Sequence, residues 1–332
     1  MTLAKRLANR AQDLLYLPGS GRFWARRLRG RALCLLYHRV DDPCLHPWLA
    51  RRGPPVIAPQ VLAQELHFWQ RLGARFGTFR DLREGWFPGA SEVGIIVCFD
   101  DGFRDNYTHG LEVLTRLGLP ATIFQVSGIV GAAELNWEHA IAFHQRDPER
   151  AATFRRLAEE AVAKDLDEAR DGLRLDDVLR FALSGGAIDR LLARAEGELG
   201  GAAESAEIAH ALYPDAGDLR RAAAAGVEIA SHGEAHQPRT RLDDRAFEHD
   251  LCTSRARLAE LVGEAPDAYS YPFGRFRPGD EAICRRHYRQ AAIVKPEPIE
   301  RGTSAWSLPR ASWPGPARNG LRRRRWLLTG RI

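Results

Sequence analysis

Two adjacent carboxylates follow an apolar run in the first third of the chain. Residues 94–99 read Gly-Ile-Ile-Val-Cys-Phe, and Asp100, Asp101 and Gly102 come next. The run predicts a strand that is buried on both faces, as in a sheet covered by helices. Neighbouring side chains of a strand point to opposite faces, but a turn at Gly102, whose backbone adopts angles that other residues avoid, would bring both acids to one cavity. The alternative is a turn with two solvated acids or a helix cap.

Two histidines form a second chemical signal. His232 and His236 lie in the stretch Ser-His-Gly-Glu-Ala-His, which follows a predicted strand at 227–230. Their spacing places both imidazoles on one side of a helical turn or a compact loop, where they suit a single metal ion. With a carboxylate from another strand end they form a set of two imidazoles and one carboxylate. This set is common at catalytic zinc and leaves room for water. The alternative for such a pair, taken alone, is a structural role.

Strands and helices alternate around these residues. The apolar patterns predict strands at 32–40, 76–79, 94–99, 120–126, 227–230, 268–271, 290–294 and 306–308. They predict helices at 59–72, 107–117, 218–225, 247–261 and 280–287. Successive strand, helix and strand form βαβ units, so a parallel sheet is expected. A predicted strand precedes the two acids, the two histidines and the stretch 270–274. In α/β folds the active site lies at the carboxyl ends of the strands.

The chain divides into four parts by composition. Residues 31–137 and 216–315 carry the alternating pattern, whereas residues 138–215 are rich in Ala, Arg, Glu and Leu and predict a helical insertion. The charged residues of the insertion predict a solvated face, with a cap over the cleft as the alternative. Residues 1–30 form a basic N-terminal arm and residues 316–332 a basic C-terminal tail. These basic ends are either solvated or bind an anionic membrane surface or a polyanion. Residues 1–30 are either a frayed arm or an amphipathic helix in peripheral membrane contact.

The bulk composition excludes several classes of protein. The 332 residues carry a formal net charge of +5, but no nucleic-acid-binding motif accompanies it, so no nucleic-acid partner is expected. No apolar run is long enough to cross a membrane, and residues 1–30 lack the apolar segment of a secretory signal. The five cysteines are scattered and never spaced as CxxC, which favours a reducing compartment. We therefore expect a cytoplasmic protein, with membrane association as an open alternative.

Three motifs together resemble the polysaccharide deacetylases, the family 4 carbohydrate esterases also called the NodB-homology domain. They are Phe-Asp-Asp-Gly at 99–102, Ser-His-Gly-Glu-Ala-His at 231–236 and Ser-Tyr-Pro-Phe-Gly at 270–274, in the order of the family. Leu-Tyr-His-Arg-Val at 36–40 is similar to the opening of the branch that includes the biofilm poly-N-acetylglucosamine deacetylases. The resemblance covers residues 31–137 and 216–315. It implies an α/β fold, a distorted and incomplete (β/α) barrel of mostly parallel strands, and removal of N-acetyl groups from a sugar in a polysaccharide or glycolipid precursor.

The resemblance also implies roles for individual residues. Asp100 would be the general base, Asp101, His232 and His236 would bind one divalent metal ion, for which zinc is expected, and the backbone N–H of Phe273 would stabilise an oxyanion. No Leu-x-His motif follows residue 300, and the resembling branch places that element first, so His38 is the candidate general acid. Ser270 stands where the family often has an arginine that braces the base, and Arg310 is the candidate replacement. Gly233 stands where the family usually has Ser or Thr.

Two other functions remain open at the level of sequence. One is a metal-dependent hydrolase that cleaves a different amide. The other is a non-catalytic carbohydrate-binding or scaffold protein with a degenerate site, which Gly233 and Ser270 would favour and the intact acids and histidines oppose. Trp137, Trp306 and Trp313 either stack on sugar rings or pack in the core. The sequence predicts neither the glycan nor an oligomeric state.

Overall fold

A closed ring of parallel strands forms the centre of the protein. The structure, a computed structural model, describes residues 21–42, 48–49, 54–166 and 174–313. The ring runs β1, β10, β9, β8, β7, β6 and β5, and it closes where residues 31–37 pair in parallel with residues 93–99. Its strands are β1 (Arg31–Tyr37), β5 (Val93–Phe99), β6 (Thr122–Gln125), β7 (Glu228–Ser231), β8 (Ala268–Ser270), β9 (Gln290–Val294) and β10 (Leu308–Ser312). The expected α/β barrel is confirmed.

The barrel is distorted at one edge of β5. The first half of that edge pairs with β4 (Arg75–Gly77), and the second half pairs with β6. A separate small sheet joins β2 (Arg39–Val40) to β3 (Val56–Ile57), also in parallel. Both faces of the barrel strands are buried, because alternate residues point into the barrel and out toward the helices. In β1, Cys34 and Leu36 pack inside the barrel, whereas Leu33 and Leu35 pack outside.

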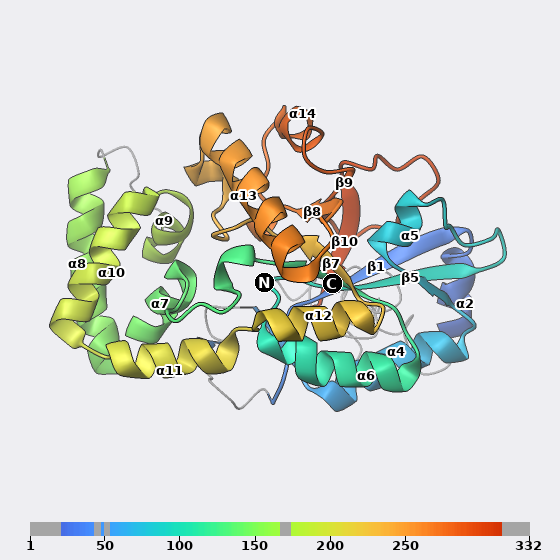
Figure 1. The fold of residues 1–332 in the computed structure, drawn as a ribbon, viewed down its shortest axis with the longest axis horizontal. Coiled ribbons are helices and arrows are strands. Elements are labelled where there is room, and N and C mark those ends of the chain that lie inside the picture. The colour runs from blue at the N-terminus through green and yellow to red at the C-terminus, as the bar shows by residue number, and fades with distance from the viewer. Residues whose placement is uncertain (1–20, 43–47, 50–53, 167–173, 314–332) are drawn as a thin grey trace, which may run out of the picture.

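Helices cover the outside of the barrel (Figure 1). They are α2 (Gly21–Arg27), α4 (Pro59–Arg71), α5 (Phe79–Arg83), α6 (Leu111–Leu117), α12 (Ala216–Ala224), α13 (Asp244–Val262) and α14 (Asp280–Cys284). A π-helical turn at Asn106–Gly110 precedes α6. Local sequence sets the helix ends: Asp215 caps α12 through a reciprocal hydrogen-bonded box with Asp218, and Gly263 ends α13 in the left-handed conformation.

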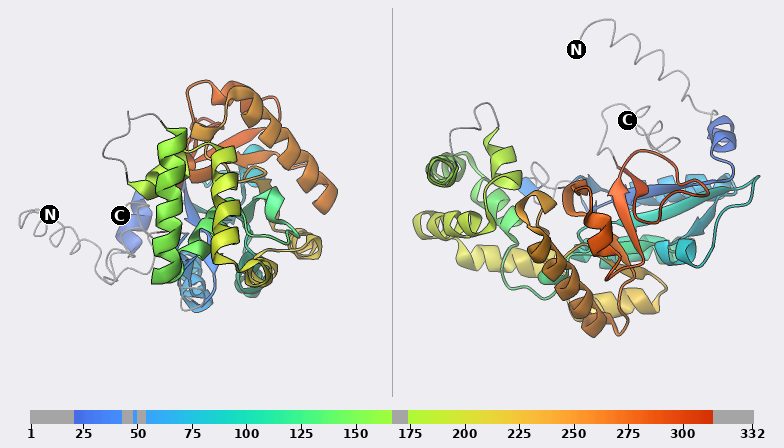
Figure 2. Two further views of the ribbon diagram at one scale, coloured as in Figure 1. Left: turned by 90° about the vertical axis from the view of Figure 1, so that its left-hand side faces the viewer. Right: turned by 90° about the horizontal axis from the view of Figure 1, so that it is seen from above.

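The helical insertion has a hydrophobic core of its own. Its helices are α7 (Trp137–His144), α8 (Pro148–Asp165), α9 (Leu175–Phe181), α10 (Gly185–Leu199) and α11 (Ala202–Leu212). Phe154 and Leu157 of α8 pack with Ile188 and Leu191 of α10 in this core. The insertion lies at the end of the barrel opposite α2, which leads into the start of β1 (Figures 1 and 2). It therefore lies beside the carboxyl ends of the strands.

Three predicted strands differ from the structure. The strand predicted at 32–40 divides into β1 and β2, which belong to separate sheets. The last strand runs over Leu308–Ser312 rather than 306–308, since Pro309, which lacks an N–H donor, suggested an end that does not occur. The strand predicted at 76–79 is β4, and Phe79 instead begins α5 behind a Thr78 cap. The correction at β10 matters for the site, because it places Arg310 within a barrel strand.

The expectations for the two basic ends fall mostly outside the described residues. The amphipathic helix expected within residues 1–30 is described only over α2, and the basic tail at 316–332 lies outside the described residues. Among the helices that the structure describes, none has the length and apolar character needed to cross a membrane.

Candidate active site

Backbone strain gathers at the carboxyl ends of three barrel strands. Within the described part of the chain, the non-glycine residues with positive φ are Asp101 (70°), His236 (53°) and Phe273 (58°). Gly102 follows Asp101 with a φ of 74°, so the chain turns there as expected, and a Cβ at this position would overlap the side-chain amide of Gln125. Non-glycine residues in this conformation persist only where surrounding structure imposes it, and they cluster at functional sites.

Asp101, His232 and His236 converge in one buried cluster. The Nε2 atom of His236 lies 3.3 Å from Asp101 Oδ1, and the Nε2 atom of His232 lies 3.6 Å from the same oxygen. One ligand atom from each residue lies within 4.8 Å of the others, which is an arrangement that could hold a metal ion. The carboxylate from β5 and the imidazoles from the loop after β7 thus come together as the sequence predicted.

In each imidazole, Nδ1 is the ring nitrogen that points away from Asp101, and it donates a hydrogen bond to an acceptor. Nδ1 of His232 donates to the backbone carbonyl of Ser270 at 2.8 Å, and Nδ1 of His236 donates to Glu138 Oε2 at 3.2 Å. A proton on Nδ1 leaves the lone pair on Nε2, the atom that faces Asp101. Both rings are therefore fixed in the tautomer and orientation that a metal ligand needs.

Burial and neighbouring charges set the protonation of the cluster. Burial lowers the pKa of His232 to about 3, so this imidazole is neutral at neutral pH. Burial also lowers the pKa of His236, but the carboxylates of Asp101 and Glu138 outweigh it and the net shift is upward. Burial raises the pKa of Asp101 despite the nearby imidazoles. Neutral His232 is ready to bind a metal, and His236 would bind one in its neutral form.

Asp100 meets a different partner from its neighbour Asp101. Arg310 of β10 contacts both carboxylate oxygens of Asp100, with Nη2 2.9 Å from Oδ2, and Nη2 also donates to Ser270 Oγ at 2.6 Å. Burial alone would raise the pKa of Asp100, but Arg310 and then His232 outweigh it and bring the pKa to about 2. The small Ser270 thus leaves space for the arginine, which reaches the acid from another strand.

A cavity of about 250 Å³ opens over these residues. Asp100, Asp101, His38 and the loop residue Phe273 line it, together with His232 and His236. Among the described residues, the buried Nδ1 of His38 has no hydrogen-bond partner. The ring of Phe273 packs against the ring of His236, with centroids 4.6 Å apart. All seven residues singled out from the sequence therefore lie in or directly beneath one cavity.

Solved structures with a similar fold include three bacterial proteins. IcaB from Ammonifex degensii aligns with a TM-score of 0.57 at 16% identity, covering 90% of this chain and 97% of that chain. The deacetylase PplD from Streptococcus pyogenes, solved in complex with acetate, gives 0.55 at 13% identity over 85% of this chain and 92% of that one. The BpsB deacetylase domain from Bordetella bronchiseptica gives 0.50 at 15% identity over 86% and 96%. At these low identities, the structural likeness shows a shared fold. No curated protein matches the chain.

A family model locates the resemblance within the sequence. Residues 181–287 match the family described as polysaccharide deacetylase, a span that contains His232, His236 and the stretch 270–274. The chain carries a polysaccharide deacetylase domain. Asp100 and Asp101 lie outside the matched span, but the closed barrel brings them to the histidines of the deacetylase domain.

Gly233, in the loop between the two histidines, lies close to the carboxylate of Asp250. Its φ is 79°, and a Cβ there would lie 2.6 Å from Asp250 Oδ2. The carboxylate of Asp250, whose pKa burial raises to about 6, accepts hydrogen bonds from the backbone N–H groups of Glu234 (3.1 Å) and Ala235 (3.3 Å). The missing side chain thus lets an acid approach closely and hold the loop between the two histidines.

No pattern in the sequence indicated that Glu138 is part of the site. It lies in α7, in the insertion whose charged residues were expected to be solvated, yet its side chain is only 11% exposed. It contacts His236 and pairs with Arg180 of α9 at 3.2 Å. Burial raises the pKa of Glu138, but His236 and Arg180 outweigh this and lower it. The alternative role of the insertion, as a cap over the cleft, agrees with this contact. Nothing in the spacing of residues 98 positions apart could have predicted the contact.

Proposed function

We propose that the protein is a metal-dependent deacetylase that removes N-acetyl groups from an N-acetylated sugar in a polysaccharide or glycolipid precursor. The observation that carries the proposal is the buried cluster of Asp101, His232 and His236, with the ionised Asp100 beside it in the same cavity. A structural carbohydrate-binding protein has no use for two oriented imidazoles, a third ligand and a separate braced acid. The domain family supports the same reaction class.

The cluster fits a zinc ion by its donor chemistry. Two imidazole nitrogens and one carboxylate oxygen are a donor set that catalytic zinc takes, and each imidazole already has its outer nitrogen bonded to an acceptor. Asp101, His232 and His236 would hold the ion. Zinc bound there would polarise the acetamide carbonyl and lower the pKa of water toward neutrality.

Asp100 and His38 would move the protons. With a pKa of about 2, Asp100 is ionised throughout the range in which enzymes are assayed, and Arg310 fixes its orientation. Such a low pKa makes a weak base, but a substrate that displaces water from the cavity would strengthen it, because desolvation raises the pKa of a carboxylate. His38 lines the same cavity and would donate a proton to the departing nitrogen, since an amide nitrogen leaves poorly as an anion.

Phe273 would stabilise the negative charge that develops on the carbonyl oxygen. Its positive φ turns the loop after β8 at the edge of the cavity, and its backbone N–H would bond to that oxygen. One such donor contributes about 3 kcal/mol in comparable sites. The products would be acetate and a free amino sugar.

The test is acetate release from N-acetylated glycans by the purified chain. N-acetylglucosamine oligomers are the first probe, assayed with added zinc, with a chelator, and with zinc restored after chelation. We expect acetate and new amino groups in equal amounts, loss of both with the chelator, and recovery with zinc. Glycan binding without acetate release under all three conditions would instead identify a carbohydrate-binding protein with an inactive site.

A further inference from the structure

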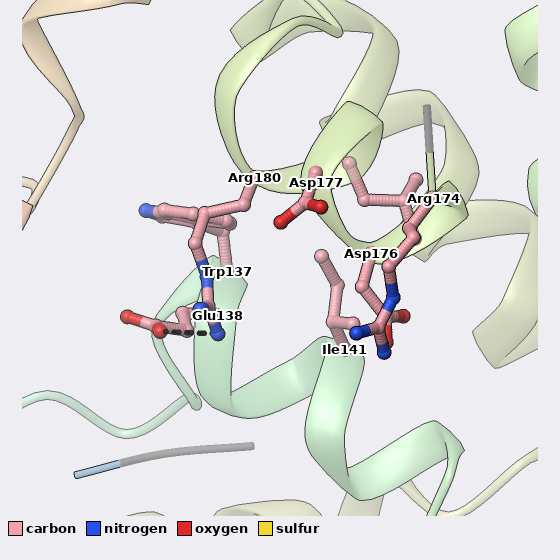
Figure 3. A pocket seen from close by; sticks show the side chains of 8 residues that line it. Trp137, Glu138, Ile141, Arg174, Asp176, Asp177 and Arg180 are labelled. Atoms are coloured by element: carbon pink, nitrogen blue, oxygen red, sulfur yellow. Dashed lines mark ion pairs between the residues drawn. The ribbon is translucent and has the colours of Figure 1, made fainter. Parts of the chain in front are cut away.

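A second cavity adjoins the catalytic one, inside the helical insertion. It has a volume of about 220 Å³, close to the 250 Å³ of the catalytic cavity. Residues 137–141 of α7 and residues 174–180 around α9 line it (Figure 3). Glu138 and Arg180, which form an ion pair at 3.2 Å, line both cavities. A molecule bound over the metal ligands therefore lies next to this second space.

The walls of the insertion cavity combine charged and apolar side chains. Figure 3 shows the Asp177 carboxylate pointing toward the middle of the cavity, between Arg180 on one side and Arg174 with Asp176 on the other. Ile141 and Leu179 supply apolar surface. Asp177 is exposed, and among the described residues no ion pair or hydrogen bond of its side chain is found. The cavity thus offers both acceptors and guanidinium donors to a ligand.

This combination selects one class of ligand. A wholly apolar ligand would desolvate the charged groups without bonding to them, which is unfavourable. An anion would meet three carboxylates, at Glu138, Asp176 and Asp177, against two guanidiniums, at Arg174 and Arg180. A neutral sugar ring suits the site, because its hydroxyls both donate and accept and its C–H face can lie on Ile141 and Leu179.

We propose that the insertion cavity binds the sugar ring next to the one whose acetyl group enters the catalytic cavity. The inference rests on the proposed function and adds a substrate preference to it: the enzyme acts on oligomers rather than on single sugars. The two cavities adjoin, have similar volumes and share one ion pair at their border. Each would accommodate one sugar ring of the same glycan. Asp177 and Arg174 are then residues that set specificity, with no part in the chemical step.

The test compares substrates of different length. We expect the unaltered protein to have a higher kcat/KM for the N-acetylglucosamine pentasaccharide than for the monosaccharide. Asp177→Asn and Arg174→Ala should each lower that preference by about tenfold, the effect of losing one or two hydrogen bonds, mainly through a higher KM. Glu207→Gln, an exposed acid of α11 with no ion pair among the described residues, is the matched control and should leave the preference unchanged.

A binding measurement separates this inference from the proposed function. The affinity for the pentasaccharide is measured by calorimetry in the Asp100→Asn background, alone and combined with Asp177→Asn or Arg174→Ala. Weaker binding in the combined variants supports the cavity as a sugar site even if no glycan is hydrolysed, in which case only the proposed reaction fails. Equal affinity in all variants, or a length preference that neither substitution changes, overturns the inference while leaving deacetylation intact.

Discussion

Asp100 and Asp101 are neighbours in sequence, but their surroundings shift their pKa values in opposite directions. Burial raises both, yet Arg310 and His232 bring the pKa of Asp100 to about 2, whereas the pKa of Asp101 stays raised beside the imidazoles. The turn at Gly102 makes this separation possible, because it directs the two side chains to different partners around one cavity. Asp101 thus faces the two imidazoles, whereas Arg310 holds Asp100 in its ionised form.

Replacement of Asp100 by Asn tests this division. Acetate release should fall by about 10²–10⁴-fold, the usual contribution of a general base, while zinc affinity stays close to that of the unaltered protein. Stability should also fall by about 3–5 kcal/mol, because Arg310 is fully buried and would lose its charged partner. The pKa of Asp100 is lowered on folding, so its stabilising contribution is present above its ordinary value of 3.8 and is lost as pH falls through about 2.

A double variant separates the two effects of that substitution. Asp100→Asn combined with Arg310→Met removes both buried charges and should recover much of the stability in urea unfolding without restoring acetate release. Full activity in Asp100→Asn, measured at saturating zinc, would remove Asp100 from the role of base.

Gly233 gives a second prediction at the scale of a single residue. Gly233→Ala should destabilise the fold by more than Gly226→Ala. Both glycines have positive φ, but a Cβ at Gly226 meets no atom within 4 Å, whereas one at Gly233 meets Asp250. The strained backbone costs about 1–3 kcal/mol in both variants, and the clash adds to it only at Gly233. Urea unfolding of the two variants measures the difference, and equal losses would show that Asp250 moves aside freely.

At the scale of elements, the insertion forms one wall of the site. Trp137 donates from its indole N–H to the Ala235 carbonyl at 3.1 Å, within the loop that carries both histidines. Phe181 packs edge-on against Phe273, with ring centroids 5.6 Å apart. Helices α7 and α9 thus contact the histidine loop and the loop after β8, both of which hold strained residues of the site.

Glu138→Gln tests whether the insertion supports metal binding. The carboxylate fixes the His236 ring and makes it a stronger ligand, so its loss should weaken zinc affinity by about 10–100-fold. Competition between the protein and a chromophoric chelator measures the zinc dissociation constant. Glu159→Gln, an exposed acid on α8 without an ion pair among the described residues, serves as the control. An unchanged zinc affinity in Glu138→Gln would limit the contact to a structural role.

The local sequence pattern predicted most of the strands, helices and site motifs. Each strand that leads into the site is a short apolar run followed by a turn, and this pattern is visible in the sequence. It failed where the relevant contact is long-range. Pro309 suggested a strand end, although the residues after it pair with β1 and β9. Glu138 resembled other charged residues of the insertion, and only the packing of α7 on the histidine loop distinguishes it. Arg310 was proposed only as the replacement for an arginine that the family resemblance implies, and its contact with Asp100 depends on closure of the barrel.

At the scale of the whole molecule, the cluster of Asp101, His232 and His236 joins distant segments of the chain. Asp101 comes from the end of β5, the two histidines from the loop after β7, and Glu138 from the insertion between them in sequence. Burial raises the pKa of Asp101, and the carboxylates of Asp101 and Glu138 raise that of His236 despite its burial, so charge interactions already couple these segments. A bound cation would link the same segments directly.

Zinc should therefore raise the thermal stability of the entire protein. At a free zinc concentration about 100 times the dissociation constant, binding to the folded state alone contributes about 2.7 kcal/mol, enough to raise the unfolding midpoint by several degrees. A chelator should reverse the shift, and His232→Ala should abolish it by removing a ligand. Thermal unfolding followed by circular dichroism measures the effect, with magnesium at the same concentration as a control for ionic strength. A midpoint that responds equally to both ions, or a zinc shift that persists in His232→Ala, would place the binding elsewhere than in the cluster of Asp101, His232 and His236.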